Sequence, residues 1–285
     1  MTITGETRRY VVADVFTDRP LEGNQLAVFT DGRGLTDELM QRAARELNLS
    51  ETVFCLPAED GGDARIRIFT PANELPFAGH PVLGAAFVLG GPLSRSSVRL
   101  ETGAGIVQVD LERQDGRVAF ARMRHPAPEP ESYERAPELL TALGVERSEL
   151  PVDVYRNGPR HVYVGLADEA AVARLRPDLG ALSELGDLCA NCFAGAGTRW
   201  KTRMFAPGLG VAEDPATGSA AGPLALHLAR HGRIAFGDEI EIRQGAEIGR
   251  PSVLFARAVG TAEAVEHLEV AGSAVVVARG EYRLA

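Results

Sequence analysis

The chain carries an internal repeat, and this repeat limits the possible folds more than any other feature. The motif at 67–71 (RIFTP) returns 136 positions later at 203–207 (RMFAP). Gly79-His80 returns 139 positions later as Gly218-Ser219. Three shorter matches begin at Asp14, Leu100 and Phe120, and their partners follow in the same order. An ordered repeat of this length predicts two similar domains.

A proline-rich stretch separates the two copies. Residues 125–132 read HPAPEPES, and proline disfavours both helices and strand pairing, so we expect an extended linker here. The sequence predicts an N-terminal domain over 1–124 and a C-terminal domain over 133–285. It leaves open that the last strand returns to the first domain.

Strand and helix patterns alternate within each half. Thr36 is a suitable N-cap for an amphipathic helix over 36–47, which Asn48 can end in a left-handed turn. A second short helix is expected over 137–143. Strands are expected over 10–13, 26–29, 98–100, 106–111, 118–123, 240–242 and 253–256. These elements predict an α+β (mixed α/β) fold with two pseudo-symmetric duplicated domains, and the cleft between domains is the expected ligand site.

The repeated glycine motifs stand where apolar helices begin. A helix N-terminus presents unpaired N–H groups and a partial positive charge, which suit a carboxylate. We therefore expect Gly79 and Gly218 to contribute backbone N–H groups to one small anionic substrate. In the alternative interpretation, the glycines only permit tight turns, and Thr217 or Ser219 caps the second helix.

Glu51 is the candidate proton carrier. It lies among apolar residues in the segment NLSETVF, where burial would raise the pKa of its carboxyl group towards the operating pH. The competing interpretation is a solvated glutamate in a loop or at a strand edge.

Two other pairs have spacings that metals or redox chemistry can use. Cys189 and Cys192 are read as ordinary thiols, because no second cysteine pair or nearby histidine accompanies them. His227 and His231 are four residues apart on a predicted helix and are read as an incidental pair. No metal site is predicted.

The composition excludes several classes of protein. A net charge of −9 without a long basic run argues against nucleic acid and acidic membrane surfaces as partners. The polar start, the lack of a membrane-length apolar run and only three cysteines predict a cytoplasmic protein.

The motifs also carry a family resemblance that covers nearly the whole chain. They are LEGNQLAVF (21–29), NLSETVF (48–54), RIFTPANELPFAGHPVLG (67–84), NCFAGAGTRW (191–200) and EDPATGSAAGPLALHLARHG (213–232). The chain resembles the phenazine-biosynthesis PhzF isomerase family. The resemblance implies a fold similar to diaminopimelate epimerase, each domain being a curved sheet or barrel around a central helix. It also implies a homodimer without metal or organic cofactor.

The resemblance implies an activity and a set of site residues. The reaction is the isomerisation of trans-2,3-dihydro-3-hydroxyanthranilate to an aminoketone. Glu51 would be the general acid/base that moves a proton from C3 to C1 on one face of the ring. The residues expected to bind substrate are His80, Asp214, Ser219, Gly79, Gly218 and Asn24.

Two other functions stay open. The first is a racemase-like or epimerase-like isomerase acting on another amino or hydroxy acid, and the second is a non-catalytic protein that binds small acids. Related epimerases use one cysteine from each half, and neither repeated loop here contains cysteine. The sequence therefore disfavours a racemase with two thiol bases.

Overall fold

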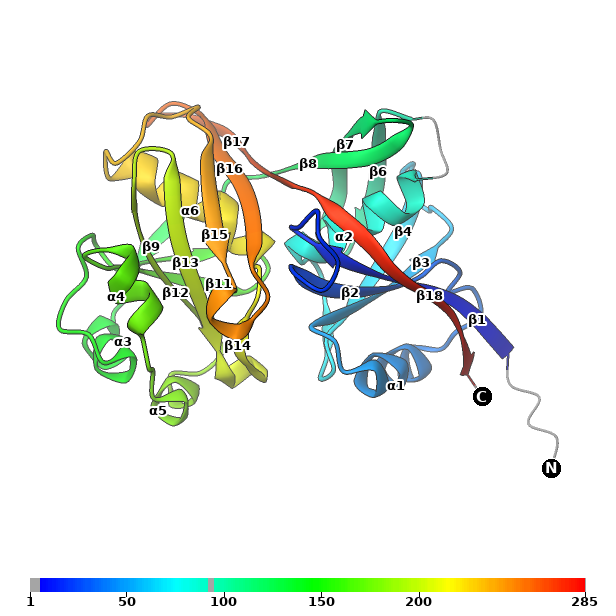
Figure 1. Cartoon of the computed structure of the whole chain (residues 1–285), viewed down its shortest axis with the longest axis horizontal. Helices are drawn as coiled ribbons and strands as arrows, with labels where there is room; N and C mark the ends of the chain where they lie inside the picture. Colours follow the sequence, from blue (N-terminus) through cyan, green and yellow to red (C-terminus); the bar gives the residue numbers. More distant parts are fainter. Residues whose placement is uncertain (1–5, 92–94, 285) are drawn as a thin grey trace. The chain divides into compact units, whose positions relative to one another are not determined.

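A computed structural model describes residues 6–91 and 95–284 (Figure 1). The chain divides into two compact units. Unit 1 comprises Met1–Arg124 together with Ala271–Ala285, and unit 2 comprises His125–Val270. Both units combine parallel and antiparallel strands with helices, which confirms the predicted α+β class.

Unit 1 is built mainly from the first half of the chain. Its strands are β1 (Glu6–Val15), β2 (Asn24–Phe29), β3 (Glu51–Leu56), β4 (Ala64–Phe69), β5 (Glu74–Leu75), β6 (Ser97–Thr102), β7 (Gly105–Gln114), β8 (Arg117–His125) and β18 (Ala274–Leu284), and its helices are α1 (Asp37–Leu47) and α2 (Gly79–Gly90). β2 runs parallel to β3, β3 is antiparallel to β4, and β4 pairs with both β5 and β6. The last strand, β18, pairs antiparallel with β1, as the red and blue arrows of Figure 1 show.

Unit 2 repeats this pairing scheme. Its strands are β9 (Pro130–Ser132), β10 (Asp153–Arg156), β11 (Arg160–Gly165), β12 (Cys189–Ala196), β13 (Arg199–Ala206), β14 (Val211–Asp214), β15 (Ile240–Gln244), β16 (Ser252–Gly260) and β17 (Val265–Gly272), and its helices are α3 (Ala136–Leu143), α4 (Glu169–Arg174), α5 (Leu179–Glu184) and α6 (Gly218–Arg230). β11 runs parallel to β12, β12 is antiparallel to β13, and β13 pairs with both β14 and β15. The sequence repeat is thus a repeat of topology.

Each unit buries one apolar helix, α2 in unit 1 and α6 in unit 2. Close packing explains a glycine in the middle of α2. A Cβ atom at Gly84 would lie 2.5 Å from Cδ2 of Leu26 and 2.8 Å from Cγ2 of Val15. The helix approaches β1 and β2 so closely that only glycine fits without rearrangement.

The local signals around α1 are confirmed. The Thr36 hydroxyl accepts a hydrogen bond from the Leu39 N–H, and Asn48 adopts a left-handed conformation with φ of 50°. Helix α3 likewise ends at Gly144 in a left-handed conformation. Side-chain caps and left-handed residues act locally, so the sequence alone can predict them.

The segment 125–132 is not only an extended linker. β9 pairs antiparallel with β10, and Pro130 lies opposite Tyr155. Proline does not exclude strand pairing at Pro130–Ser132, because a proline at the first residue of a strand loses little when its missing N–H is not needed there.

Residues 1–5, part of the polar start, lie outside the described residues. Among the helices of the described chain, none is both long and apolar enough to span a bilayer.

Candidate active site

Unit 1 brings three of the predicted site residues together. Glu51 is the first residue of β3, and its Oε2 atom lies 3.2 Å from Nε2 of His80 in the first turn of α2. The other ring nitrogen of His80, Nδ1, lies 3.3 Å from the Asn24 side-chain amide. Glu51 has only 16% of its side chain exposed and His80 only 5%, so Glu51 is not a solvated loop glutamate.

A strained turn delivers Asn24 to this contact. The backbone N–H of Leu21 donates to a buried carboxylate oxygen of Asp14 at 2.7 Å. Leu21 and Gly23 both have positive φ, and a Cβ atom at Gly23 would lie 2.4 Å from the carbonyl oxygen of Val15. The glycine of the EGN motif is therefore required for the chain to turn tightly into β2.

Burial keeps the His80 ring neutral. Desolvation lowers the pKa of His80 to about 3, and a hydrogen bond with the backbone of Gln25 opposes part of that shift. Nδ1 of this ring faces the Asn24 amide and Nε2 faces the Glu51 carboxylate, so the tautomer of the ring decides where it can donate a hydrogen bond. The Glu51 carboxyl group therefore lies beside a buried, uncharged imidazole.

Unit 2 forms a related arrangement around Ser219. His161 Nε2 lies 3.1 Å from the Ser219 hydroxyl, and Asn191 lies 3.4 Å from His161 Nδ1. Burial lowers the pKa of His161 to about 3, so this ring is also neutral. If Asn191 donates to Nδ1, His161 donates to the Ser219 oxygen, and the hydroxyl hydrogen of Ser219 can point to a ligand.

The Asp214 carboxylate belongs to a second network in unit 2. The Thr217 hydroxyl donates to Asp214 Oδ2 at 2.6 Å, and the Gln244 side chain donates to both the Asp214 carbonyl and the Thr217 hydroxyl. Asp214, Thr217 and Gln244 are all buried. The network fixes the turn that leads into α6.

Neither helix start is capped by a side chain in the described structure. Helix α2 begins at Gly79 after Ala78, and α6 begins at Gly218 after Thr217, whose hydroxyl is bound to Asp214 instead. This finding contradicts the interpretation in which Thr217 or Ser219 caps the second helix. Uncapped first-turn N–H groups suit an anionic group.

The strand registers show that the two units carry different chemistry at equivalent positions. Ile68 and Met204 are equivalent residues of the sequence repeat. Val53 in β3 pairs with Ile68, and Asn191 in β12 pairs with Met204. Two residues earlier along each strand stand Glu51 in unit 1 and Cys189 in unit 2. Glu51 is parallel-paired with Leu26, and Cys189 with His161. Cys189 is therefore the positional counterpart of Glu51.

Asp214 also lacks an acidic counterpart. It lies opposite Met204 in the β13–β14 pair, whereas Leu75 lies opposite Ile68 in the β4–β5 pair. Cys189, Cys55 and Cys192 are all buried, and none of them forms a disulfide bond within the described residues. Burial raises the pKa of Cys55 and of Cys192 to about 12, so neither thiol is a nucleophile near neutral pH.

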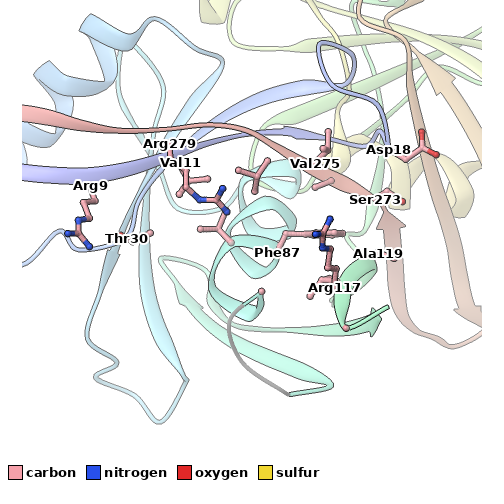
Figure 2. Close-up of a pocket in the computed structure, with 16 residues that line it drawn as sticks. Arg9, Val11, Asp18, Thr30, Phe87, Arg117, Ala119, Ser273, Val275 and Arg279 are labelled. Carbon is pink, nitrogen blue, oxygen red and sulfur yellow. The ribbon is translucent and has the colours of Figure 1, made fainter. Parts of the chain in front are cut away.

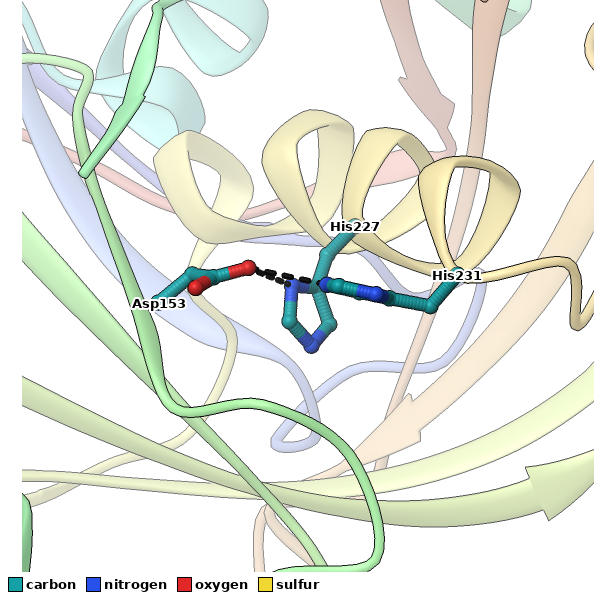
Figure 3. A group of neighbouring side chains, drawn as sticks. All are labelled: Asp153, His227 and His231. Atoms are coloured by element: carbon teal, nitrogen blue, oxygen red, sulfur yellow. Dashed lines mark hydrogen bonds and ion pairs between the residues drawn. The ribbon is translucent and has the colours of Figure 1, made fainter. Parts of the chain in front are cut away.

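A cluster outside these groups joins β10 to α6 (Figure 3). Asp153 Oδ2 lies 2.8 Å from His231 Nε2 and 3.4 Å from His227 Nδ1. The three possible metal-ligand atoms lie within 4.8 Å of one another. Their contacts already pair the carboxylate with both rings, and hydrogen bonds with His227 and then His231 lower the pKa of Asp153. The sequence spacing identified the two histidines but gave no sign of Asp153.

A cavity of about 1080 Å³ in unit 1 is separate from these residues. Figure 2 shows Phe87 and Val275 at its apolar wall, with Arg117 and Arg279 close by. Asn24, Glu51 and His80 do not line it.

Comparison with known proteins places the chain in a family. Residues 13–280 match the PhzC-PhzF model, described as phenazine biosynthesis-like protein. The chain belongs to the PhzC-PhzF family. It is 56% identical over 272 residues to trans-2,3-dihydro-3-hydroxyanthranilate isomerase from Pseudomonas aeruginosa, covering 95% of this chain and 98% of the relative. The isomerase of the same name from Pseudomonas chlororaphis is 55% identical over 271 residues, with the same coverage.

Solved structures agree with this family membership. A PhzF-family protein from Bacillus anthracis aligns with a TM-score of 0.84 at 26% identity, covering 97% of this chain and 99% of that one. A predicted epimerase from Pseudomonas aeruginosa aligns with a TM-score of 0.82 at 33% identity, covering 96% and 99%. A hydroxyproline epimerase from Agrobacterium vitis shares the fold at 15% identity and a TM-score of 0.64, covering 98% and 93%.

Proposed function

We propose that the chain is a cofactor-independent isomerase that converts trans-2,3-dihydro-3-hydroxyanthranilate to an aminoketone in phenazine biosynthesis. The observation that carries the proposal is the buried contact between Glu51 and His80. It supplies a largely buried carboxyl group in a chain whose relatives, at 55–56% identity over 98% of their length, are isomerases of that substrate.

In the proposed reaction Glu51 takes the C3 proton of the substrate and returns it at C1 on the same face of the ring. The C3–H bond breaks and a C1–H bond forms as the double bonds shift, which gives an enol that becomes the ketone. General acid–base action of this kind contributes typically ~10²–10⁴-fold in rate. His80 keeps Glu51 in position, and Asn24 fixes the His80 ring.

The remaining predicted residues are proposed to bind the polar groups of the substrate. The N–H groups of Gly79 and Gly218 would interact with its carboxylate, since their helices lack side-chain caps. The Ser219 hydroxyl would donate to an acceptor, and Asp214 would accept from the amino group. We further propose a homodimer in the cytoplasm, which sedimentation of the purified protein and cell fractionation would check.

The first test compares Glu51→Gln with the matched variant Glu46→Gln, which changes an exposed glutamate in unit 1. Consumption of the substrate is followed by ultraviolet absorbance without added cofactor, and circular dichroism checks folding. We expect Glu51→Gln to lose at least ~10²-fold in kcat and Glu46→Gln to keep wild-type activity. A folded Glu51→Gln variant with near wild-type turnover would exclude the proposed role.

Isotope transfer gives a second readout. Substrate that carries deuterium at C3 should yield product with part of that label at C1, because one carboxyl group removes and returns the proton. An active enzyme whose product carries only solvent hydrogen at C1 would point to separate bases. Deuterium uptake from solvent at the α-carbon of another amino or hydroxy acid, without turnover of the dihydroanthranilate, would favour the racemase-like alternative.

A further inference from the structure

Arg67 and Glu74 form an ion pair with two parallel hydrogen bonds, and they precede the segment that leads into α2. Arg67 Nε donates to Glu74 Oε1 at 2.7 Å, and Nη2 donates to Oε2 at 2.6 Å. The guanidinium group also lies 5.1 Å from the centroid of the Phe69 ring. Only 16% of the Arg67 side chain is exposed. Paired N–H bonds and an aromatic face together restrict the orientation of both partners.

Unit 2 contains an equivalent ion pair beside an aromatic ring. Arg203 Nε donates to Glu213 Oε1 at 2.9 Å, and Nη2 donates to Oε2 at 2.7 Å. The Arg203 guanidinium lies 4.9 Å from the ring centroid of Phe205. Its third nitrogen donates to the carbonyl oxygen of Leu175 at 2.9 Å, and the pair is almost fully buried.

The glutamate of each pair has the same spacing to the helix that follows it. Glu74 stands five residues before Gly79, which starts α2, and Glu213 stands five residues before Gly218, which starts α6. In each unit the arginine is on the long strand and the glutamate is on the short return strand. β5 has only two residues and therefore few ladder hydrogen bonds to hold it.

We propose that Arg67–Glu74 and Arg203–Glu213 are positioning pairs, each of which fixes the N-terminal turn of the helix that carries His80 or Ser219. Neither pair touches substrate in this proposal. Each holds the end of the return strand, and the short connection that follows transmits that placement to the first turn of the helix. The catalytic consequence rests on the proposed function, whereas the structural claim does not.

The structural claim is tested by hydrogen–deuterium exchange on the full-length chain. Glu74→Gln is compared with Arg33→Gln, which breaks the paired Arg33–Asp31 bonds elsewhere in unit 1. We expect amide exchange in 76–82 to rise about tenfold or more in Glu74→Gln, because local opening controls exchange, and to stay at the wild-type rate in Arg33→Gln. Unchanged exchange in that segment would overturn the proposal.

The second arm repeats the comparison in unit 2 with a conservative change. Arg203→Lys keeps the positive charge but cannot form the paired bonds to Glu213. Exchange in 213–219 should rise while the melting transition stays cooperative. If Arg203→Lys exchanges like wild type in this segment, the paired geometry does not position the helix start.

Kinetics test the catalytic consequence. We expect Glu74→Gln and Arg67→Lys to lower kcat about 10-fold to 100-fold with a smaller change in KM, since a displacement near 1 Å can cost ~10²-fold in rate. The double variant Arg67→Gln/Glu74→Gln should be no slower than the slower single variant. An inactive wild type would refute the proposed function but leave the exchange result to decide the positioning claim. An active wild type whose Glu74→Gln variant keeps full kcat would refute the catalytic consequence.

Discussion

At the scale of single residues, the two units bury a neutral histidine beside a polar group that a ligand can use. His80 contacts Glu51 in unit 1, and His161 contacts Ser219 in unit 2. In both, the second ring nitrogen faces an asparagine amide. Because burial lowers the pKa of both rings to about 3, each histidine contacts its partner without carrying a charge.

Burial of these histidines predicts a loss of stability in acid. The pKa values of His80 and His161 fall to about 3, and that of His125 falls to about 4. Between those values and the usual 6.5, the unfolded chain binds protons that the folded chain does not. Their contribution to stability is therefore complete above pH 6.5 and is lost as the pH falls towards 3, at up to about 1.4 kcal/mol per pH unit for each histidine.

Urea denaturation of wild type and His161→Gln at pH 7.5 and pH 5.5 checks this prediction. The variant should be less stable at pH 7.5 and should lose less stability between the two pH values. If the variant lost as much stability between pH 7.5 and pH 5.5 as wild type, His161 would not contribute to the pH dependence of stability.

At the scale of elements, the buried helix α2 depends on close approach to its neighbouring strands. Gly84→Ala should destabilise unit 1 by about 2 kcal/mol, although alanine is the better helix former, because the added methyl group meets Leu26 and Val15. Gly91→Ala is the matched control at the exposed end of the same helix, where the backbone is already helical. Equal stability of the two variants in urea would contradict the packing argument.

The elements also show what the sequence alone can predict. The caps of α1 at Thr36 and Asn48 were predictable because they depend on neighbours within a few residues. The pairing of β9 with β10 and the contact between Asp153 and His231 were not predictable, since both depend on which distant strands and helices meet. The sequence predicted that Glu51 and His80 belong to one site, but it did not predict that they are in contact. The geometry of this contact follows from strand register, which tertiary packing decides.

At the scale of the whole molecule, the repeat preserves topology but not the reactive groups. Glu51 has Cys189 as its positional counterpart, and Asp214 has Leu75. The features shared by both units lie at the start of the buried helix. They are a buried helix that begins at glycine and an arginine–glutamate pair ahead of it.

Unit 1 also depends on the far end of the chain. Deletion of residues 273–285 removes β18, the antiparallel partner of β1 from Val15 back to Glu6. We expect this truncation to abolish amide protection in unit 1 and to leave it in unit 2, because every strand of residues 125–270 is still present. Full protection of β1 and β2 in the truncated protein would contradict this expectation.

The same pairing of β1 with β18 has a consequence for biosynthesis. On the ribosome, the first residues of unit 1 emerge long before their partner strand has been translated. Unit 2 is contiguous in sequence and can complete its contacts while β1 still has an open edge. The half that carries Glu51 is thus the first to be synthesised and the last to be completed, and its exposed β1 edge is a place where chaperones or neighbouring nascent chains can bind.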